Sequence, residues 1–134
     1  MKILIAEDDL TSRKFLFKVL SQYGECDLVV DGLEALDAYL LAHKEAKPYD
    51  LICLDIMMPK VDGVKVLKNI RDLEAQKGIP QEKRAKIIMT TALAETQYVQ
   101  NAFDIGCDAY AAKPIDIAKL TEVLTNLGLI NSDK

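Results

Sequence analysis

Polar side chains suited to chemistry stand directly at the ends of four short apolar runs. The residues concerned are Glu7 and Asp8 after the first run, Asp55 after the third, Thr91 after the fourth and Lys113 after the fifth. Clustered carboxylates repel one another unless a proton or a cation lies between them. Mg²⁺ suits a site that offers one or two carboxylates together with water and phosphate oxygens. If the runs meet at one edge of a sheet, the sequence predicts a Mg²⁺ site there.

The other groups in this set match phosphoryl transfer. Asp55 has the carboxylate of a nucleophile. The Lys113 amine would neutralise one phosphoryl oxygen, and the Thr91 hydroxyl would donate a hydrogen bond to another. Taken singly, each of these residues has a simpler interpretation. An acidic pair after a strand can cap a helix, Thr91 can cap the end of a strand, and Lys113 can be a charge exposed to solvent. Asp55 follows four apolar residues, where an unpaired carboxylate is costly, and the combination favours phosphoryl attachment to Asp55.

The five apolar runs are predicted to be strands. The third and fourth carry apolar side chains at successive positions, which is typical of a parallel sheet covered on both faces. In open α/β sheets of this kind, ligands bind beyond the carboxyl ends of the strands. The candidate residues therefore fall where a site is expected. The predicted strands cover residues 2–6, 26–30, 51–54, 86–90 and 109–112.

Helical periodicity fills the segments between and after these strands. Strand–helix alternation favours an α/β fold with a mainly parallel sheet and right-handed crossovers. The positions that define the five helices are Phe15, Leu16, Val19 and Leu20; Leu33, Leu36 and Leu40; Val66, Leu67, Ile70 and Leu73; Tyr98, Val99, Ala102 and Phe103; and Ile117, Leu120, Leu124 and Leu127.

Local signals mark the connections between these elements. Asp31 and Gly32 look like a plain turn after the second strand. Gly106 is expected to end the fourth helix in a left-handed conformation, and Asp116 to cap the start of the fifth. The polar segment 75–85, which contains a glycine and a proline, is expected to be loose.

Length and composition exclude several classes of protein. The 134 residues suit one domain, expected over residues 1–130 with a frayed tail at 131–134. The net charge of −4 disfavours direct binding to nucleic acids and anionic membranes. His43 is the only histidine, which excludes a histidine-based triad and a multi-histidine metal site.

No apolar run approaches the ~18 residues of a membrane span, and the first run is too short and acidic for a signal peptide. A cytoplasmic location, with the three cysteines reduced, is expected.

Four motifs in order make the chain resemble the response-regulator receiver domain of two-component signalling, the family of the chemotaxis regulator CheY. The resemblance covers about residues 2–128. It implies a doubly wound, five-stranded parallel sheet of strand order 2-1-3-4-5 with five helices. The motifs are ILIAEDD from residue 3, DIMMPKVDG from residue 55, Thr91-Ala92 and Lys113-Pro114.

The resemblance implies roles for the acidic residues. Asp55 would be the phosphoacceptor. The Mg²⁺ ligands would be Asp8, Glu7 (directly or through water), Asp55 and the backbone carbonyl of Met57. Asp9 falls just after the metal-binding pair and is expected to start a helix instead. No other cofactor is implied.

The resemblance also implies a switching mechanism. Thr91 would move toward the phosphoryl group, and Lys113 would pair with Asp55 and then with its phosphate. The peptide bond from Lys113 to Pro114 would be cis. Tyr110 would turn inward when Thr91 moves. The side chains of Met57 and Leu93 would border the path of the water that hydrolyses the acyl phosphate.

A sensor histidine kinase or a histidine phosphotransfer protein is the implied phosphoryl donor, with an unidentified downstream target. The chain would act as a signalling protein that catalyses only its own phosphorylation and dephosphorylation. It would be a monomer or a phosphorylation-dependent homodimer.

Two alternatives remain beside this interpretation. The first is a Mg²⁺-dependent phosphohydrolase with an aspartyl-phosphate intermediate, similar to the haloacid dehalogenases. Those enzymes place the nucleophile after the first strand and a second acid two residues beyond it, whereas Met57 stands two residues beyond Asp55 here. The second is a degenerate receiver that binds partners without phosphate. Such proteins usually lack an acid, the hydroxyl or the amine, and this sequence has all of them.

Overall fold

Five parallel strands form one sheet in the order β2-β1-β3-β4-β5. The structure is a computed structural model and describes residues 1–92 and 96–131. The sheet and its register confirm the expected α/β fold, including the strand order that the resemblance implied. The strands are β1 (Lys2–Ala6), β2 (Glu25–Val29), β3 (Leu51–Asp55), β4 (Lys86–Thr91) and β5 (Ala109–Ala112).

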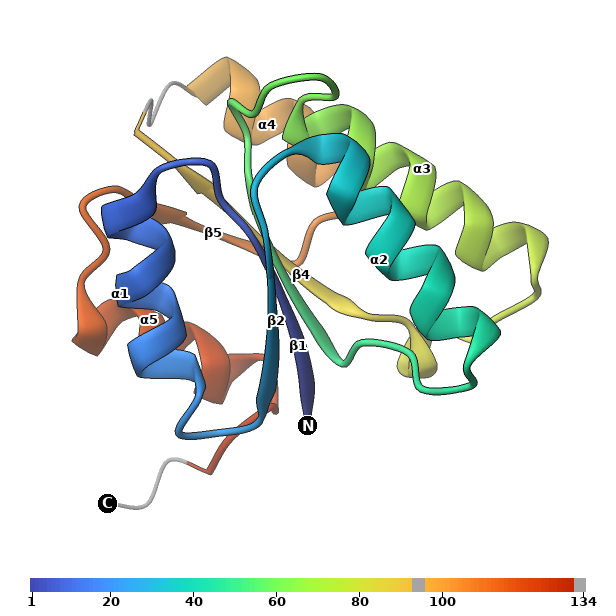
Figure 1. Cartoon of the computed structure of the whole chain (residues 1–134), viewed down its shortest axis with the longest axis horizontal. Coiled ribbons are helices and arrows are strands. Elements are labelled where there is room, and N and C mark those ends of the chain that lie inside the picture. Colours follow the sequence, from blue (N-terminus) through green and yellow to red (C-terminus); the bar gives the residue numbers. More distant parts are fainter. Residues whose placement is uncertain (93–95, 132–134) are drawn as a thin grey trace.

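Helices cover both faces of this sheet. In Figure 1, α1 and α5 lie on one face, while α2, α3 and α4 lie on the other. A single 3₁₀ turn precedes β4. The helical elements are α1 (Leu10–Leu20), α2 (Gly32–Lys44), α3 (Gly63–Gln76), η1 (Gln81–Lys83), α4 (Thr96–Ile105) and α5 (Ile117–Asn126).

The alternation of side chains along each strand divides the core into two clusters. Along β1, Ile3 and Ile5 pack on the α1 and α5 side, whereas Leu4 and Ala6 pack on the α2 and α3 side. All five residues of β3 are buried. This explains the uninterrupted apolar run in the sequence, because a central strand is covered on both faces.

Aspartate side chains begin four of the helices. The side chains of Asp9, Asp31, Asp62 and Asp116 each accept a hydrogen bond from the backbone N–H three residues later. This satisfies a donor that the first turn would leave free. The predictions that Asp9 starts a helix and that Asp116 caps the last one are confirmed.

The strand boundaries differ slightly from the predicted ones. The second strand begins and ends one residue earlier than expected, at Glu25 and Val29. The third and fourth strands each continue one residue further, so that Asp55 and Thr91 are their last residues. Backbone hydrogen bonding therefore holds both candidate residues directly.

Two other expectations need correction. The buried face of α2 contains Ala35, Tyr39 and Ala42, whereas Leu33 and Leu40 of the predicted stripe are exposed. Leu36, the third leucine of the predicted stripe, does pack against the core.

Segment 75–85 is also more ordered than expected, since it contains the end of α3 and all of η1. Two hydrogen bonds at its end hold it. The Ala85 N–H donates to the buried Glu74 carboxylate at 3.0 Å, and the Arg84 side chain donates to the Ile79 carbonyl at 2.9 Å.

The structure also places the three cysteines and the single histidine. Cys26, Cys53 and Cys107 are free thiols that are buried or half-buried, as predicted. His43 lies in the last turn of α2, where its ring packs on that of Tyr39 with the ring centres 4.5 Å apart. No helix among the described residues is both long enough and apolar enough to cross a membrane. Of the expected tail, residues 132–134 lie outside the described residues.

Candidate functional site

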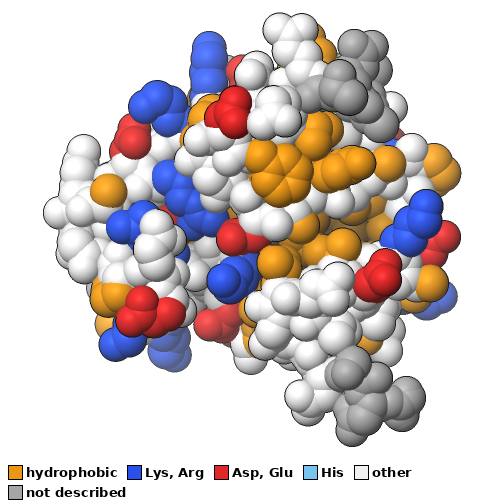
Figure 2. Space-filling model, turned by 180° about the vertical axis from the view of Figure 1, so that it is seen from behind, with side chains coloured by type: hydrophobic (Ala, Val, Ile, Leu, Met, Phe, Trp, Pro, Cys, Tyr) orange, Lys and Arg blue, Asp and Glu red, His pale blue; other side chains and the backbone are white. Residues whose placement is uncertain are grey.

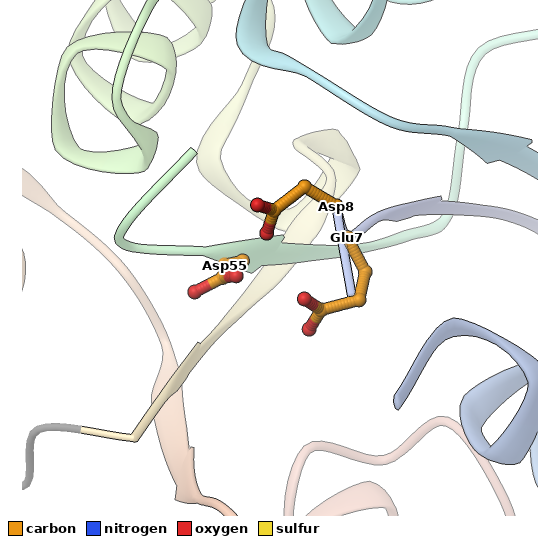
Figure 3. Close-up of side chains that lie close together, drawn as sticks. All are labelled: Glu7, Asp8 and Asp55. Atoms are coloured by element: carbon orange, nitrogen blue, oxygen red, sulfur yellow. The ribbon is translucent and has the colours of Figure 1, made fainter. Parts of the chain in front are cut away.

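Three carboxylates meet at the carboxyl end of the sheet. Glu7 and Asp8 follow β1 directly, and Asp55 ends the neighbouring strand β3. One oxygen atom from each carboxylate lies within 4.8 Å of those of the other two, and the three side chains are drawn in Figure 3. Glu7 is fully buried and Asp55 is 4% exposed, whereas Asp8 faces solvent. The site therefore holds buried acids with one side open to solvent.

Lys113 supplies a positive charge to this cluster. Its Nζ atom lies 2.7 Å from Oε1 of Glu7 and 3.0 Å from Oδ2 of Asp55, to which it donates a hydrogen bond. Lys113 follows β5, and its backbone N–H donates to the Thr91 carbonyl at 2.8 Å. The peptide bond between Lys113 and Pro114 is cis, as the resemblance implied.

Burial and mutual repulsion shift the pKa values of these groups. Burial, followed by the nearby Glu7 carboxylate, raises the pKa of Asp55 against the opposing effect of Lys113. Burial and then Asp55 likewise raise the pKa of Asp8. For Lys113, burial alone lowers the pKa, but Glu7 and Asp55 outweigh it and the pKa is raised. The ammonium form of Lys113 is thus stabilised by acids that repel one another.

Backbone groups hold the acids in place from two sides. The N–H of Met57 donates to Oδ1 of Asp55 at 3.2 Å, and that of Asp9 donates to Oε2 of Glu7 at 3.1 Å. The Arg13 side chain donates to the carbonyl of Glu7 at 2.8 Å. Sequence reasoning missed this role of Arg13, although its place one turn after the N-cap Asp9 is a usable signal.

The hydroxyl and the aromatic residue of the predicted switch lie on neighbouring strands. Thr91 ends β4 and is fully buried. Asp55 pairs with Thr90, so that Thr91 stands one residue further along the adjacent strand. Tyr110 on β5 is 43% exposed, and its ring meets the edge of Phe103 with the ring centres 6.3 Å apart.

The two residues expected to border the hydrolytic water differ in what can be said of them. The Met57 side chain is 54% exposed. It borders a groove of about 390 Å³ shared with the side of α4, where Tyr98 and Asn101 lie. Leu93 lies outside the described residues.

The donor set fits a hard divalent cation. Three carboxylates face a single ammonium group, so the cluster carries excess negative charge. Apart from the Lys113 amine, the side-chain groups in the cluster are carboxylates, and their oxygen atoms are the ligands that Mg²⁺ prefers. The open side at Asp8 leaves room for water or phosphate oxygens. The three acids predicted as metal ligands thus do lie together.

The sequence is similar to those of known signalling proteins. The sequence model of the response regulator receiver domain family matches residues 3–125. The chain is 33% identical to a probable histidine kinase of Oryza sativa. The matched region covers 92% of this chain but only 12% of the kinase. It is 36% identical to the probable transcriptional regulatory protein SilR of Salmonella typhimurium over 90% of this chain and 47% of that protein. The chemotaxis protein CheY of Treponema pallidum is 29% identical, with 94% and 81% of the two chains covered.

Two solved structures resemble the fold closely. One is the CheX-CheY-BeF₃-Mg²⁺ complex of Borrelia burgdorferi, with a TM-score of 0.81 and 28% identity over 96% of this chain and 89% of that one. The other is the receiver domain of Ssk1 bound to the histidine phosphotransfer protein Ypd1 of Saccharomyces cerevisiae. Its TM-score is 0.80 and its identity 26%, over 98% and 93% of the two chains.

Proposed function

This chain belongs to the response regulator receiver domain family, and we propose that it is a phosphorylation-activated switch with Asp55 as the phosphoacceptor. The observation that carries the proposal is the position of the Lys113 amine, which contacts both Glu7 and Asp55 in a cluster of three carboxylates. A buried carboxylate at the end of a central strand, held by an amine and a backbone N–H, is a positioned nucleophile.

The reaction transfers a phosphoryl group from phosphohistidine. A carboxylate oxygen of Asp55 bonds to phosphorus as the P–N bond breaks, and the electron pair of that bond returns to the imidazole ring. Lys113 stabilises the charge on the transferred group, and Thr91 donates a hydrogen bond to it. Water later attacks phosphorus, which releases inorganic phosphate and restores the carboxylate.

Glu7, Asp8, Asp55 and the Met57 carbonyl would hold Mg²⁺. When bound, the ion neutralises charge on the phosphoryl oxygens. The acidic cluster supports this assignment, as does the Mg²⁺ in the related CheY complex of Borrelia burgdorferi. The chain's own contribution is to hold the acids against their mutual repulsion.

Phosphorylation would change the surface around α4, β5 and α5. This back face of the molecule gathers hydrophobic side chains, which Figure 2 shows in orange. Phe103, Tyr110 and Ile117 on these elements are each more than two-fifths exposed. Thr91 and Lys113 adjoin the ends of β4 and β5, so a shift toward a phosphate on Asp55 would reach this face.

The phosphoryl donor would be a sensor histidine kinase or a histidine phosphotransfer protein, as the Ypd1–Ssk1 complex supports. The downstream target is a protein that distinguishes the two states of the back face. A cytoplasmic location and either a monomer or a phosphorylation-dependent homodimer fit this role.

The proposal is tested by incubating the chain with Mg²⁺ and acetyl phosphate and measuring intact mass. We expect one added phosphoryl group, and none in Asp55→Asn, because an amide lacks the nucleophilic carboxylate. Asp72→Asn is the matched control, since Asp72 lies exposed on α3, where it pairs with the exposed Lys68. Labelling of Asp55→Asn at the level of the control would contradict the assignment.

A further inference from the structure

The loop between β3 and α3, residues 56–62, is a closed backbone ring beside Asp55. Its two ends are joined by the Gly63 N–H, which donates to the Ile56 carbonyl at 2.9 Å. A Cβ atom at Gly63 would overlap the Asp55 carbonyl oxygen. The N–H of Met57 in this loop is the one that donates to Asp55. The position of the loop thus determines what surrounds the Asp55 carboxylate.

A strained residue lies at the far side of this ring. Lys60 has φ of +70°, in the left-handed region that non-glycine residues rarely occupy. The Val61 N–H donates back to the Pro59 carbonyl at 2.8 Å, so Lys60 is the centre of a γ-turn of the strained type. Such conformations persist only where the surroundings hold them.

The start of α2 provides that support. The Gly32 N–H donates to the Pro59 carbonyl at 3.3 Å. A Cβ atom at Gly32 would overlap the Val61 carbonyl oxygen, so the two backbones touch directly. Asp31 also faces the loop, with its carboxylate 3.6 Å from the amine of Lys60. Asp31 and Gly32, expected to be a plain turn, are therefore a contact surface for the loop.

We infer that Gly32 is a positioning residue for Asp55. Its lack of a side chain lets the start of α2 press against Val61, which keeps the ring in place and the Met57 N–H on Asp55. This inference rests on the proposed function, since it concerns the efficiency of the same site. A side chain at position 32 would push the Val61 carbonyl away, and the closed ring would pass that displacement to Met57.

Gly24 provides a matched control for this inference. A Cβ atom at Gly24 would also overlap a backbone carbonyl oxygen, that of Met1, at the opposite end of the sheet. Neither Gly24 nor Gly32 has a positive φ. Gly24→Ala and Gly32→Ala therefore introduce the same kind of clash, one far from the site and one against its loop.

Mg²⁺ affinity, measured by calorimetry, and the labelling rate with acetyl phosphate are compared for both variants and the wild type. Because partners that support metal ligands are worth about 10-fold or more in affinity or activity, Gly32→Ala is expected to lose about 10-fold in both. Gly24→Ala should lose stability alone. Equal affinities and rates in the two variants would overturn the inference.

A second variant separates an effect on the position of the loop from an effect on the stability of the fold. It is also the variant to measure if Gly32→Ala alone does not fold. Lys60→Gly, added to Gly32→Ala, removes the left-handed penalty and lets the loop move away from the new methyl group. We expect stability to recover while Mg²⁺ affinity and labelling stay low. Recovery of all three would show that Gly32 acts on folding only. If the wild type neither binds Mg²⁺ nor becomes labelled, the result contradicts the proposed function itself and not only the role of Gly32.

Discussion

Charged groups are buried at both ends of the sheet, and their partners differ. At the amino end, Arg71 of α3 donates to Glu74 at 2.7 Å and to Asp108 at 2.9 Å. It also donates to the carbonyls of Gly106 and Ala85, each at 2.9 Å. The remaining carboxylate contacts go to backbone N–H groups at the start of β4. One cation and two anions are thus held in a network of matched donors and acceptors.

At the carboxyl end, the excess of negative charge is larger, with three carboxylates around one amine against two carboxylates around one guanidinium at the amino end. Among the described residues, Lys113 is the amine that contacts the cluster, and it faces Glu7 and Asp55 while Asp8 remains beside them. The pKa values of Asp8 and Asp55 are raised there, first by burial and then by a neighbouring carboxylate. A matched network serves to hold the fold, whereas excess negative charge favours the binding of a cation or proton. We therefore propose that the charged groups at the amino end hold the fold and that those at the carboxyl end carry the chemistry.

The largest effect is expected at the structural end. Arg71→Met leaves Glu74 and Asp108 without their cation, and breaking a buried pair costs about 3–5 kcal/mol. Urea unfolding should show a loss of this size. Lys68→Met is the control, because Lys68 and Asp72 form an exposed pair worth at most about 1 kcal/mol. Equal losses in the two variants would remove the distinction between network and surface pair.

Removal of the amine at the other end should slow the chemistry, and it also leaves the buried Glu7 and Asp55 carboxylates without their cation. In Lys113→Ala the nucleophile remains, so labelling at Asp55 continues, about 100-fold slower for the loss of one preorganised donor. The conformational response should be lost, as it should be in Thr91→Ala. Amide chemical shifts around Tyr110 before and after addition of donor report that response. Shifts as large as in the wild type would refute the separation of attachment from response.

A smaller effect is expected from Asp8. Asp8→Ala should weaken Mg²⁺ binding by about 10-fold, because one anionic ligand is lost. The same change removes a like charge next to Asp55, so the metal-free chain should unfold at a slightly higher urea concentration. Asp37→Ala, on the exposed side of α2, is the control. Unchanged Mg²⁺ affinity in Asp8→Ala would exclude Asp8 as a ligand.

The smallest effect concerns the lifetime of the phosphoryl group. Met57 cannot hydrogen-bond an attacking water, whereas the amide in Met57→Asn can. One neutral hydrogen bond is worth about 1 kcal/mol, or about fivefold in rate. Timed decay of the phosphorylated mass, after removal of donor, should therefore be faster in the variant. Equal or slower decay would mean that this half-exposed side chain does not control the water.

The contrast between the two ends also explains what the sequence could predict. Glu7, Asp55 and Lys113 were found because each stands at the end of an apolar run, and parallel strands bring their carboxyl ends together. The Arg71 network was not found, since Arg71 and Asp108 lie 37 positions apart with no periodic signal to join them. Such contacts depend on how far a long side chain extends toward a distant loop, and local sequence patterns carry no information about that.

Strand ends and helix faces show the same limit at shorter range. Asp55 was placed outside its strand because a carboxylate interrupts the apolar pattern, although backbone pairing with Thr90 continues through it. In α2, Leu33 and Leu40 were expected to face the core together with Leu36, but only Leu36 does so, and Ala35 takes part in their place. Gly32 was read as a turn residue, since nothing local indicates which backbone lies against it.

We propose above all that the excess carboxylates at the carboxyl end of the sheet make Asp55 a phosphoacceptor. Hydride reduction of the phosphorylated chain, followed by peptide mass mapping, tests it directly, because an acyl phosphate is reduced to an alcohol. We expect homoserine at position 55 and unmodified Glu7 and Asp8. A reduced residue at either of those positions, or phosphate on a side chain at the Arg71 end, would contradict it.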